Sequence, residues 1–222
     1  MDFTSIARQV IISAVPILIA IIVHEVAHGF VAYKLGDPTA KALGRLTLNP
    51  LAHIDPFGTI LMPILLYVLT SGQFVFGYAK PVPINPNNFR NPRRDMAISA
   101  AGGPGSNIVL ALLGVILLKY GVLPAATVAP QEMVNTFLIP IKEMLLAGIF
   151  INIILASINL IPIPPLDGGR VLMGLLPWRQ SEALGKIEPF GMIIVMVLFF
   201  TGIANYIILP LKWLFFQFLG LF

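Results

Sequence analysis

Long apolar segments are the feature that most restricts how this chain can fold. Four stretches reach the roughly 17 to 25 apolar residues that a membrane-spanning helix needs, and they cover residues 9–33, 96–118, 144–163 and 189–209. A soluble domain has about a quarter charged residues, whereas this chain has 11% charged and 57% hydrophobic residues. We therefore predict an all-α polytopic membrane protein, with a single membrane-embedded domain over residues 1–222.

The first apolar segment resembles a signal peptide only superficially. The stretch MDFTSIARQ before it holds one Arg and one Asp, and the apolar run continues into HEVAH at 24–28, so we expect a retained helix. The chain has no cysteine, and any metal ion must therefore be held by His, Asp or Glu. The net charge of +4 is small and no Lys/Arg tract stands out, which makes nucleic acid an improbable partner.

Charge placement indicates how the chain lies in the membrane. The apolar segment 59–70 is too short for a full span, and we expect a re-entrant or half-spanning element there. Loops 34–58, 71–95 and 164–188 then share one side. That side carries ten basic residues: Lys34, Lys41, Arg45, Lys80, Arg90, Arg93, Arg94, Arg170, Arg179 and Lys186. The other side carries four, namely Arg8, Lys119, Lys142 and Lys212. Because basic loops stay inside, we predict an outer N-terminus and mostly cytoplasmic loops.

The loop over residues 72–94 is dense in Pro, Asn and Gly. Its FVFGYA start and its PVPI alternation predict short extended elements, with a hairpin edge as one form of them. Non-helical backbone at membrane depth is tolerated only where protein or a water-filled cavity surrounds it. We therefore expect this loop to lie against the helical core.

Polar residues His24, Glu25 and His28 interrupt the first apolar segment. Such groups are costly in hydrocarbon unless something pairs with them or coordinates them. At positions i and i+4 the two imidazoles share one helical face and can reach one metal ion. Glu25, rotated by about 100° from His24 along the helix, can hold and deprotonate a water on that ion. The spacing therefore favours a hydrolytic metal site over a satisfied polar patch.

Two histidines leave such a site short of a protein ligand. Asp167 is the favoured third ligand, because three prolines before it forbid an ordinary helix and Gly168 and Gly169 let the chain turn back toward the first span. His53 is the rival, since His is a common metal ligand. A helix-capping role for Asp167 stays open as well.

The motifs HEVAH at 24–28 and NLIPIPPLDGG at 159–169 resemble the signatures of the site-2 protease family of intramembrane zinc metalloproteases, HExxH on one span and NxxPxPxLDG on a later one. NPLAHIDPFGT, GYAKPVPINP and AGGPGSN resemble its compact prokaryotic branch, which lacks PDZ and CBS domains. The resemblance covers residues 20 to 175. It implies a three-helix catalytic core within residues 9–175 and one bound Zn²⁺ ion.

The resemblance also implies roles for individual residues. His24, His28 and Asp167 would bind the zinc ion, which favours Asp167 over His53 as the third ligand. Glu25 would be the general base that activates the water and later passes the proton to the leaving amine.

Three further residues match the family signatures. Asn159 would lie beside the catalytic centre and hold the substrate backbone or the oxyanion. His53 would act through substrate contact, oxyanion stabilisation or loop structure, and it is kept as a candidate catalytic residue. Asn107 would serve packing and positioning.

The predicted reaction is hydrolysis of peptide bonds within or near transmembrane segments of membrane proteins, in a prokaryotic cell (inner) membrane with the active site toward the cytoplasm. A substrate helix must unwind first, and pairing with an extended segment at 78–86 or 43–50 would assist. A metal transporter is the main alternative, but it does not explain Glu25 and usually needs an internal repeat. A catalytically idle scaffold is disfavoured because all four core catalytic positions are intact.

Overall fold

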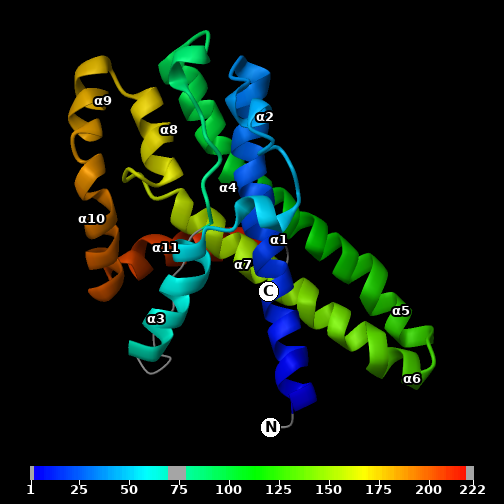
Figure 1. Cartoon of the computed structure of the whole chain (residues 1–222). Helices are drawn as coiled ribbons and strands as arrows, with labels where there is room; N and C mark the ends of the chain where they lie inside the picture. The colour runs from blue at the N-terminus through cyan, green and yellow to red at the C-terminus, as the bar shows by residue number, and fades with distance from the viewer. Residues whose placement is uncertain (1–2, 70–78, 219–222) are drawn as a thin grey trace.

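The computed structural model describes residues 3–69 and 79–218 of the 222-residue chain. Within these ranges every regular element is a helix and no β-strand occurs, which confirms the predicted all-α fold (Figure 1). Three helices in the described residues are long and apolar enough to cross a membrane: Ile11–Leu35, Pro92–Val128 and Gln131–Asn159. They overlap the three predicted core spans at 9–33, 96–118 and 144–163, and the protein is an integral membrane protein.

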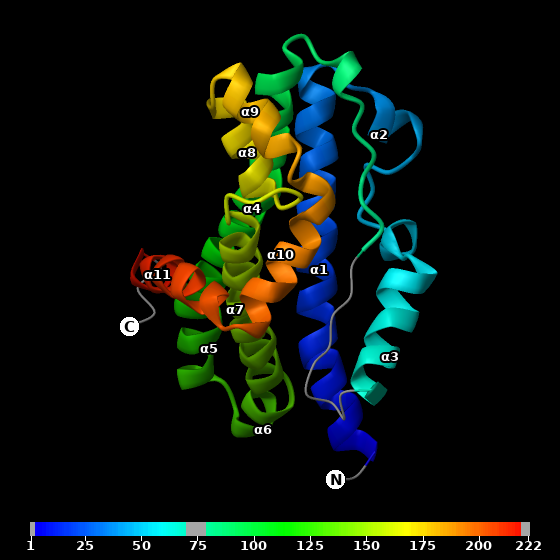
Figure 2. The same ribbon diagram turned by 90° about the vertical axis from the view of Figure 1, so that its left-hand side faces the viewer.

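Helix α4 lies at the centre of the core. It packs against three other helices (Figure 2). The four elements are α1 (Phe3–Leu35), α4 (Pro92–Leu117), α7 (Ile139–Asn159) and α8 (Asp167–Leu175). Because lipid tails are as apolar as the helices, helix association depends on the close packing that small residues allow. A Cβ at Gly114 would lie 2.8 Å from Ile149 Cγ1, so this glycine lets α4 and α7 approach each other.

Helical conformation extends beyond the predicted ends of two spans. After α4 the chain passes through the π-helical turn Leu118–Val122 into α5 (Leu123–Val128). The short α6 (Gln131–Met133) and a second π-helical turn, Val134–Leu138, then lead into α7. Figure 1 shows these elements as a hairpin at the end of the molecule opposite α2 (Thr39–Ala42). Residues 119–143, which separate two predicted spans, are thus mostly helical.

The chain turns sharply between α7 and α8. Helix α7 ends at Asn159, before the first proline of the turn, rather than at residue 163 as predicted. A Cβ on Gly168 would collide with the carbonyl oxygen of Leu160, and one on Gly169 with the backbone nitrogen of Pro164. The two glycines therefore let the start of α8 pack directly on the preceding backbone, which is the back-folding that the sequence predicts.

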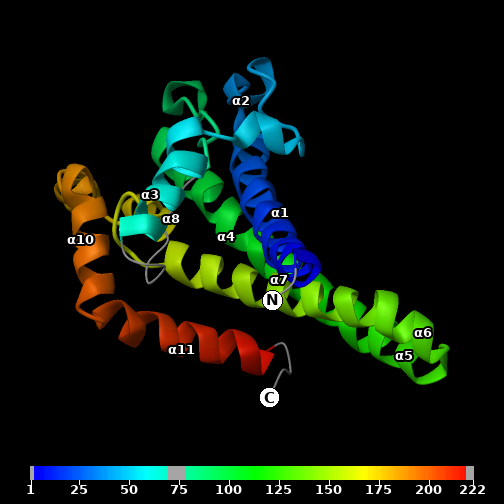
Figure 3. The ribbon, with the colours of Figure 1, turned by 60° about the horizontal axis from the view of Figure 1, so that its bottom comes forward.

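The prediction of one continuous helix over 189–209 is wrong. After α9 (Trp178–Gly185), the structure has α10 (Glu188–Phe200) and α11 (Ile203–Phe218), with a break between them. Gly202 has φ of +76°, a left-handed conformation that ends a helix and that glycine adopts without steric cost. Helix α11 turns away from α10 and lies along α7 (Figure 3). Neither α10 nor α11 is among the three helices that qualify as spans.

The predicted half-spanning segment 59–70 is helical and short. A π-helical turn over Pro56–Leu61 leads into α3 (Met62–Leu69), and this apolar helix does not reach the length of a span. The hairpin edge predicted within 72–94 is not formed in the described part of that loop, because residues 79–85 follow an extended course but form no strand (Figure 2). The prediction for residues 72–78 lies outside the described residues. Two 3₁₀ turns, Pro50–His53 and Pro86–Asn88, complete the fold.

Candidate metal centre

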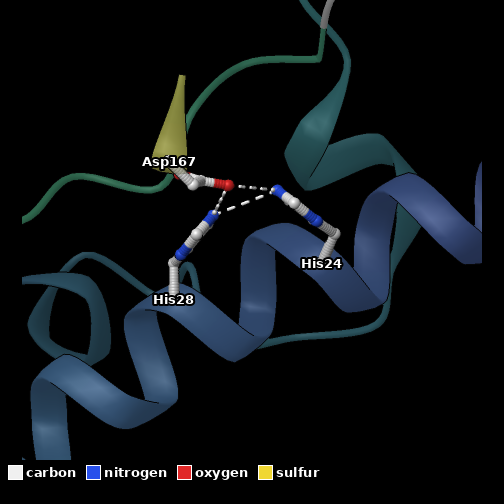
Figure 4. Close-up of side chains that lie close together, drawn as sticks. All are labelled: His24, His28 and Asp167. Atoms are coloured by element: carbon white, nitrogen blue, oxygen red, sulfur yellow. Dashed lines mark hydrogen bonds and ion pairs between the residues drawn. The ribbon is translucent and has the colours of Figure 1, made fainter. Parts of the chain in front are cut away.

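The side chains of His24, His28 and Asp167 converge on one point (Figure 4). Asp167 Oδ2 lies 3.2 Å from Nε2 of each histidine, and the two Nε2 atoms are 3.1 Å apart. All three residues are buried, with 7%, 8% and 8% of their surfaces exposed. Tetrahedral Zn²⁺ with N and O ligands at about 2.0–2.2 Å places donor atoms about 3.3 Å apart. The spacing of the three atoms therefore fits zinc.

The hydrogen bonds of the two Nδ1 atoms determine whether the Nε2 atoms that face Asp167 are donors or acceptors. His28 Nδ1 donates to the carbonyl oxygen of Ser99 at 2.8 Å, and His24 Nδ1 donates to Asn107 Oδ1 at 2.6 Å. With the proton on Nδ1, each neutral imidazole presents a lone pair at Nε2. Within the described residues, Asp167 Oδ2 has no hydrogen-bond donor. Three acceptors thus face one another, and a cation is the partner that satisfies them.

A chain of amides fixes the orientation of His24. Asn107 Nδ2 donates to Asn152 Oδ1 at 2.7 Å and to the Ala20 carbonyl at 3.3 Å, so its Oδ1 must face His24. Asn152 Nδ2 in turn donates to the Gly148 carbonyl at 2.7 Å. Asn107 and Asn152 are 0% and 4% exposed. Helices α4 and α7 therefore hold the histidine through buried, paired groups, and such partners commonly orient the histidines that bind metal ions.

Glu25 lies on the same helix, but it makes a different contact. Its Oε2 accepts the backbone N–H of Val82 at 2.8 Å. Val82 belongs to the extended segment 79–85, which packs against α1 at Gly29. The segment is also tied at both ends: Lys80 N–H donates to the His53 carbonyl at 2.9 Å, and Asn85 N–H donates to Asp37 Oδ2 at 2.7 Å.

Asp37, two residues beyond the end of α1, anchors this segment. It is 0% exposed and accepts hydrogen bonds from Asn88 Nδ2 at 2.7 Å, from the Thr39 backbone N–H at 3.0 Å and from the Thr39 hydroxyl. Burial alone would raise the pKa of Asp37, but the hydrogen bonds from Asn88, Thr39 and Asn85 lower it below its ordinary value. The ionised carboxylate is therefore the form that holds the loop.

The structure brings some predicted site residues together and leaves others apart. Asp167, and not His53, joins the two histidines in the group that can hold a metal ion. His53 is 2% exposed and donates from Nε2 to the Thr47 carbonyl at 2.8 Å. Asn159 is half-buried at the end of α7, where its Nδ2 donates to the Leu155 carbonyl at 3.0 Å. Neither residue contacts the three converging side chains through a hydrogen bond or ion pair in the described part of the chain.

Sequence reasoning missed Ser99 and Asn152, and it noted Gly103 only as part of the motif AGGPGSN. Asn152 carries a signal that could have found it, because a buried amide within an apolar span needs a partner there. Ser99 acts through its backbone carbonyl, which the sequence does not distinguish from any other. A Cβ at Gly103 would meet the rings of both histidines, a constraint that only the packing of α4 on α1 reveals.

Fold and site together define a class of protein. Helices long enough to cross a membrane carry an HExxH motif whose histidines meet an aspartate from a later segment, which is the arrangement of a membrane-embedded metalloprotease. A model of Peptidase family M50 matches residues 12–202, and the chain belongs to this family. The resemblance to site-2 proteases is thereby confirmed.

Similar proteins carry names that agree with this family. "Putative zinc metalloprotease YwhC" of Bacillus subtilis (strain 168) is 38% identical over 201 residues, covering 89% of this chain and 84% of that protein. "Putative zinc metalloprotease Rip2" of Mycolicibacterium smegmatis is 29% identical over 207 residues, covering 91% and 72%. No solved structure matches the chain. The protein is an intramembrane zinc metalloprotease, and the alternatives of a transporter or an idle scaffold are not favoured.

Proposed function

We propose that this protein hydrolyses peptide bonds within or near transmembrane segments of other membrane proteins. His24, His28 and Asp167 hold the zinc ion, and Glu25 is the general base. The observation that carries the assignment is the set of three buried acceptor atoms, 3.1–3.2 Å apart, with no donor among the described residues. We further propose that residues 1–222 form a single membrane-embedded domain with its catalytic core over 9–175.

Zinc, when bound, acts as a Lewis acid that makes water a better nucleophile and polarises the scissile carbonyl. Glu25 takes the proton of the attacking water and later gives it to the leaving amine. Its Oε2 is occupied by the Val82 N–H, so Oε1 is the oxygen that handles the proton. Asp167 and the two histidines do not exchange protons in this scheme, because their donor atoms are committed to the ion.

Asn159 and His53 are assigned lesser roles. Asn159 ends α7 shortly before Asp167, so its amide can contact the substrate backbone or the oxyanion from the side of α8. The backbone carbonyl of His53 accepts the Lys80 N–H, and its ring is bonded to Thr47, which supports a role in loop structure. A substrate contact through His53 Nδ1, which has no partner in the described part of the chain, is the second candidate.

An unwound substrate can pair with the extended segment 79–85 only in a restricted way. The N–H groups of Lys80, Val82 and Asn85 are already bonded within the protein, and Pro81 and Pro83 have none. The segment therefore offers mainly carbonyl acceptors to a partner strand. A transmembrane substrate meets this requirement, because unwinding frees its own N–H groups. Residues 43–50 remain the alternative edge.

Charge placement supports a topology with the active site toward the cytoplasm of a prokaryotic cell. Figure 1 shows α2, the start of α4 and α9 at one end of the molecule, with the N-terminus and the α5–α6 hairpin at the other. Loops 34–58, 71–95 and 164–188 carry ten basic residues, and this positive bias supports a cytoplasmic position for these loops. His24 and His28 lie closer to the α2 end of the molecule along α1.

Glu25→Gln tests the mechanism against the transporter alternative. We expect the purified variant to keep its zinc but to lose cleavage of a model transmembrane substrate in detergent, because Gln cannot accept the proton. Glu132→Gln, at an exposed position on α6, is the matched control and should cleave normally. Normal cleavage by the Glu25 variant with zinc bound would disprove the proposed role of this residue.

A further inference from the structure

We propose that the backbone N–H of Val82 positions the carboxylate of Glu25 for proton transfer. The inference rests on the proposed role of Glu25 as general base. The N–H to Oε2 distance of 2.8 Å lies in the range of about 2.7–2.9 Å typical of charge-assisted hydrogen bonds. Within the described residues it is the one hydrogen bond that Glu25 makes. It fixes one carboxylate oxygen and leaves the other to accept a proton.

Val82 packs against α1 at a glycine, Gly29, where no side chain fills the space. Gly29 lies four residues after Glu25, on the same face of the helix. A Cβ at Gly29 would lie 2.6 Å from Val82 Cγ1 and 2.8 Å from Leu46 Cδ2, far inside the roughly 3.5–4.0 Å of a normal carbon contact. Val82 is 7% exposed. Its buried side chain therefore anchors the residue whose N–H reaches the base.

Two prolines fix the register of this contact. Pro81 and Pro83 flank Val82 and have no N–H to donate. A slip of the segment by one residue in either direction would place a proline against Glu25 and leave the carboxylate without its donor. Only one register therefore gives the Glu25 carboxylate an N–H donor. The hydrogen bonds of Lys80 and Asn85 on either side of Val82 keep the segment in this register.

The direct test replaces this one N–H group. Val82→α-hydroxyvaline, introduced by nonsense suppression into the full chain, converts the amide to an ester and keeps the side chain. With a synthetic transmembrane peptide that the wild type cleaves, we expect kcat to fall about 10- to 100-fold, as for lost orienting partners elsewhere. KM and zinc content should stay within about twofold of wild type, because the metal ligands and the path of the segment are unchanged.

The same ester placed at Ile84 is the matched control. Ile84 also follows a proline in the segment, and its N–H makes no hydrogen bond to Glu25. Gly29→Ala is a second variant in case the ester at residue 82 does not fold, since its Cβ pushes Val82 away from α1 and should lower kcat in the same way.

Three results would overturn the proposal: an unchanged kcat in the Val82 ester, an equal loss in the Ile84 ester, or a loss explained by missing zinc. Failure of the proposed function looks different, because Glu25→Gln would then still cleave the peptide.

Discussion

Gly103 on α4 offers the most direct physical test of the metal centre. It faces both zinc-binding histidines of the proposed site, and a Cβ there would lie 2.5 Å from His28 Cε1 and 2.6 Å from His24 Cε1. Carbon atoms pack at about 3.5–4.0 Å, so Gly103→Ala requires a relative displacement of about 1 Å between α4 and the two rings. The rings are already fixed by Asn107 and Ser99 on the same helix, so they cannot retreat without losing those hydrogen bonds.

The expected loss of zinc affinity follows from how little change in ligand distance a zinc site tolerates. Ligand distances in zinc sites hold to within about 0.2 Å, and a shift of about 1 Å is several times that margin. Losing even an outer partner of a zinc ligand typically costs 10–100-fold in affinity, or about 1.4–2.7 kcal/mol. We therefore expect Gly103→Ala to bind zinc at least about 100-fold more weakly. Proteolysis should fall in parallel.

Zinc content after equilibration with a competing chelator is the measurement, on protein purified in detergent. Gly105→Ala is the matched control, because it lies on the same helix and its Cβ would meet nothing within 4 Å. That variant should bind zinc normally and be slightly more stable, since Ala favours a helix over Gly by up to about 1 kcal/mol. Equal zinc affinity in both variants would refute the close packing of α4 on the two rings.

Three other variants test separate parts of the structure. Asp167→Asn keeps the shape but removes the anionic ligand, and it should bind little zinc in the same chelator assay, whereas full occupancy would exclude Asp167 as a ligand. Asn107→Leu leaves His24 Nδ1 without its acceptor, so zinc affinity should fall about 10- to 100-fold, and an unchanged affinity would show that the amide only packs. The pKa of Asp37 is lowered on folding. The Asp37 carboxylate therefore stabilises the folded protein at pH values above its unfolded pKa of about 3.9, and this stabilisation disappears as the pH falls through the lower folded pKa. Asp37→Asn should therefore lower the melting temperature of the zinc-free protein at pH 7 but have a shrinking effect toward pH 3, and a pH-independent difference would contradict this.

The three core spans were predictable because each is long and apolar. The break at Gly202 was not, since an isolated glycine in an apolar run is also tolerated within a helix and its left-handed φ depends on where α11 packs. The helical hairpin over 119–143 escaped prediction for a related reason. Its glycine and prolines predict a break, but the π-helical turn Leu118–Val122 continues past Gly121, and Pro124 and Pro140 lie in the first turns of α5 and α7, where a proline is tolerated.

At the site, the sequence predicted the residues that are proposed to carry the chemistry and missed several groups that position them. His24, Glu25, His28 and Asp167 belong to spaced motifs, whereas the contacts of Val82 with Glu25 arise from a backbone N–H. Backbone groups are present at every non-proline residue, so no side-chain pattern marks the few that matter. The sequence already favoured Asp167 over His53, because prolines before it and two glycines after it allow the chain to fold back, and the structure groups Asp167 with the two histidines.

The histidines proposed as metal ligands and Glu25, the proposed base, are held by different parts of the fold, and this difference has a consequence for catalysis. Helix α4 orients both histidines through Asn107 and Ser99, and it is packed against α1, α7 and α8. Glu25 is oriented by an extended segment whose ties to the rest of the chain are mainly single hydrogen bonds. Segments of that kind open at much lower free energy than packed helices. Perturbing the segment should thus slow turnover while zinc stays bound, and perturbing α4 should release zinc. A protease built this way can admit a substrate strand beside its base without dismantling its metal site.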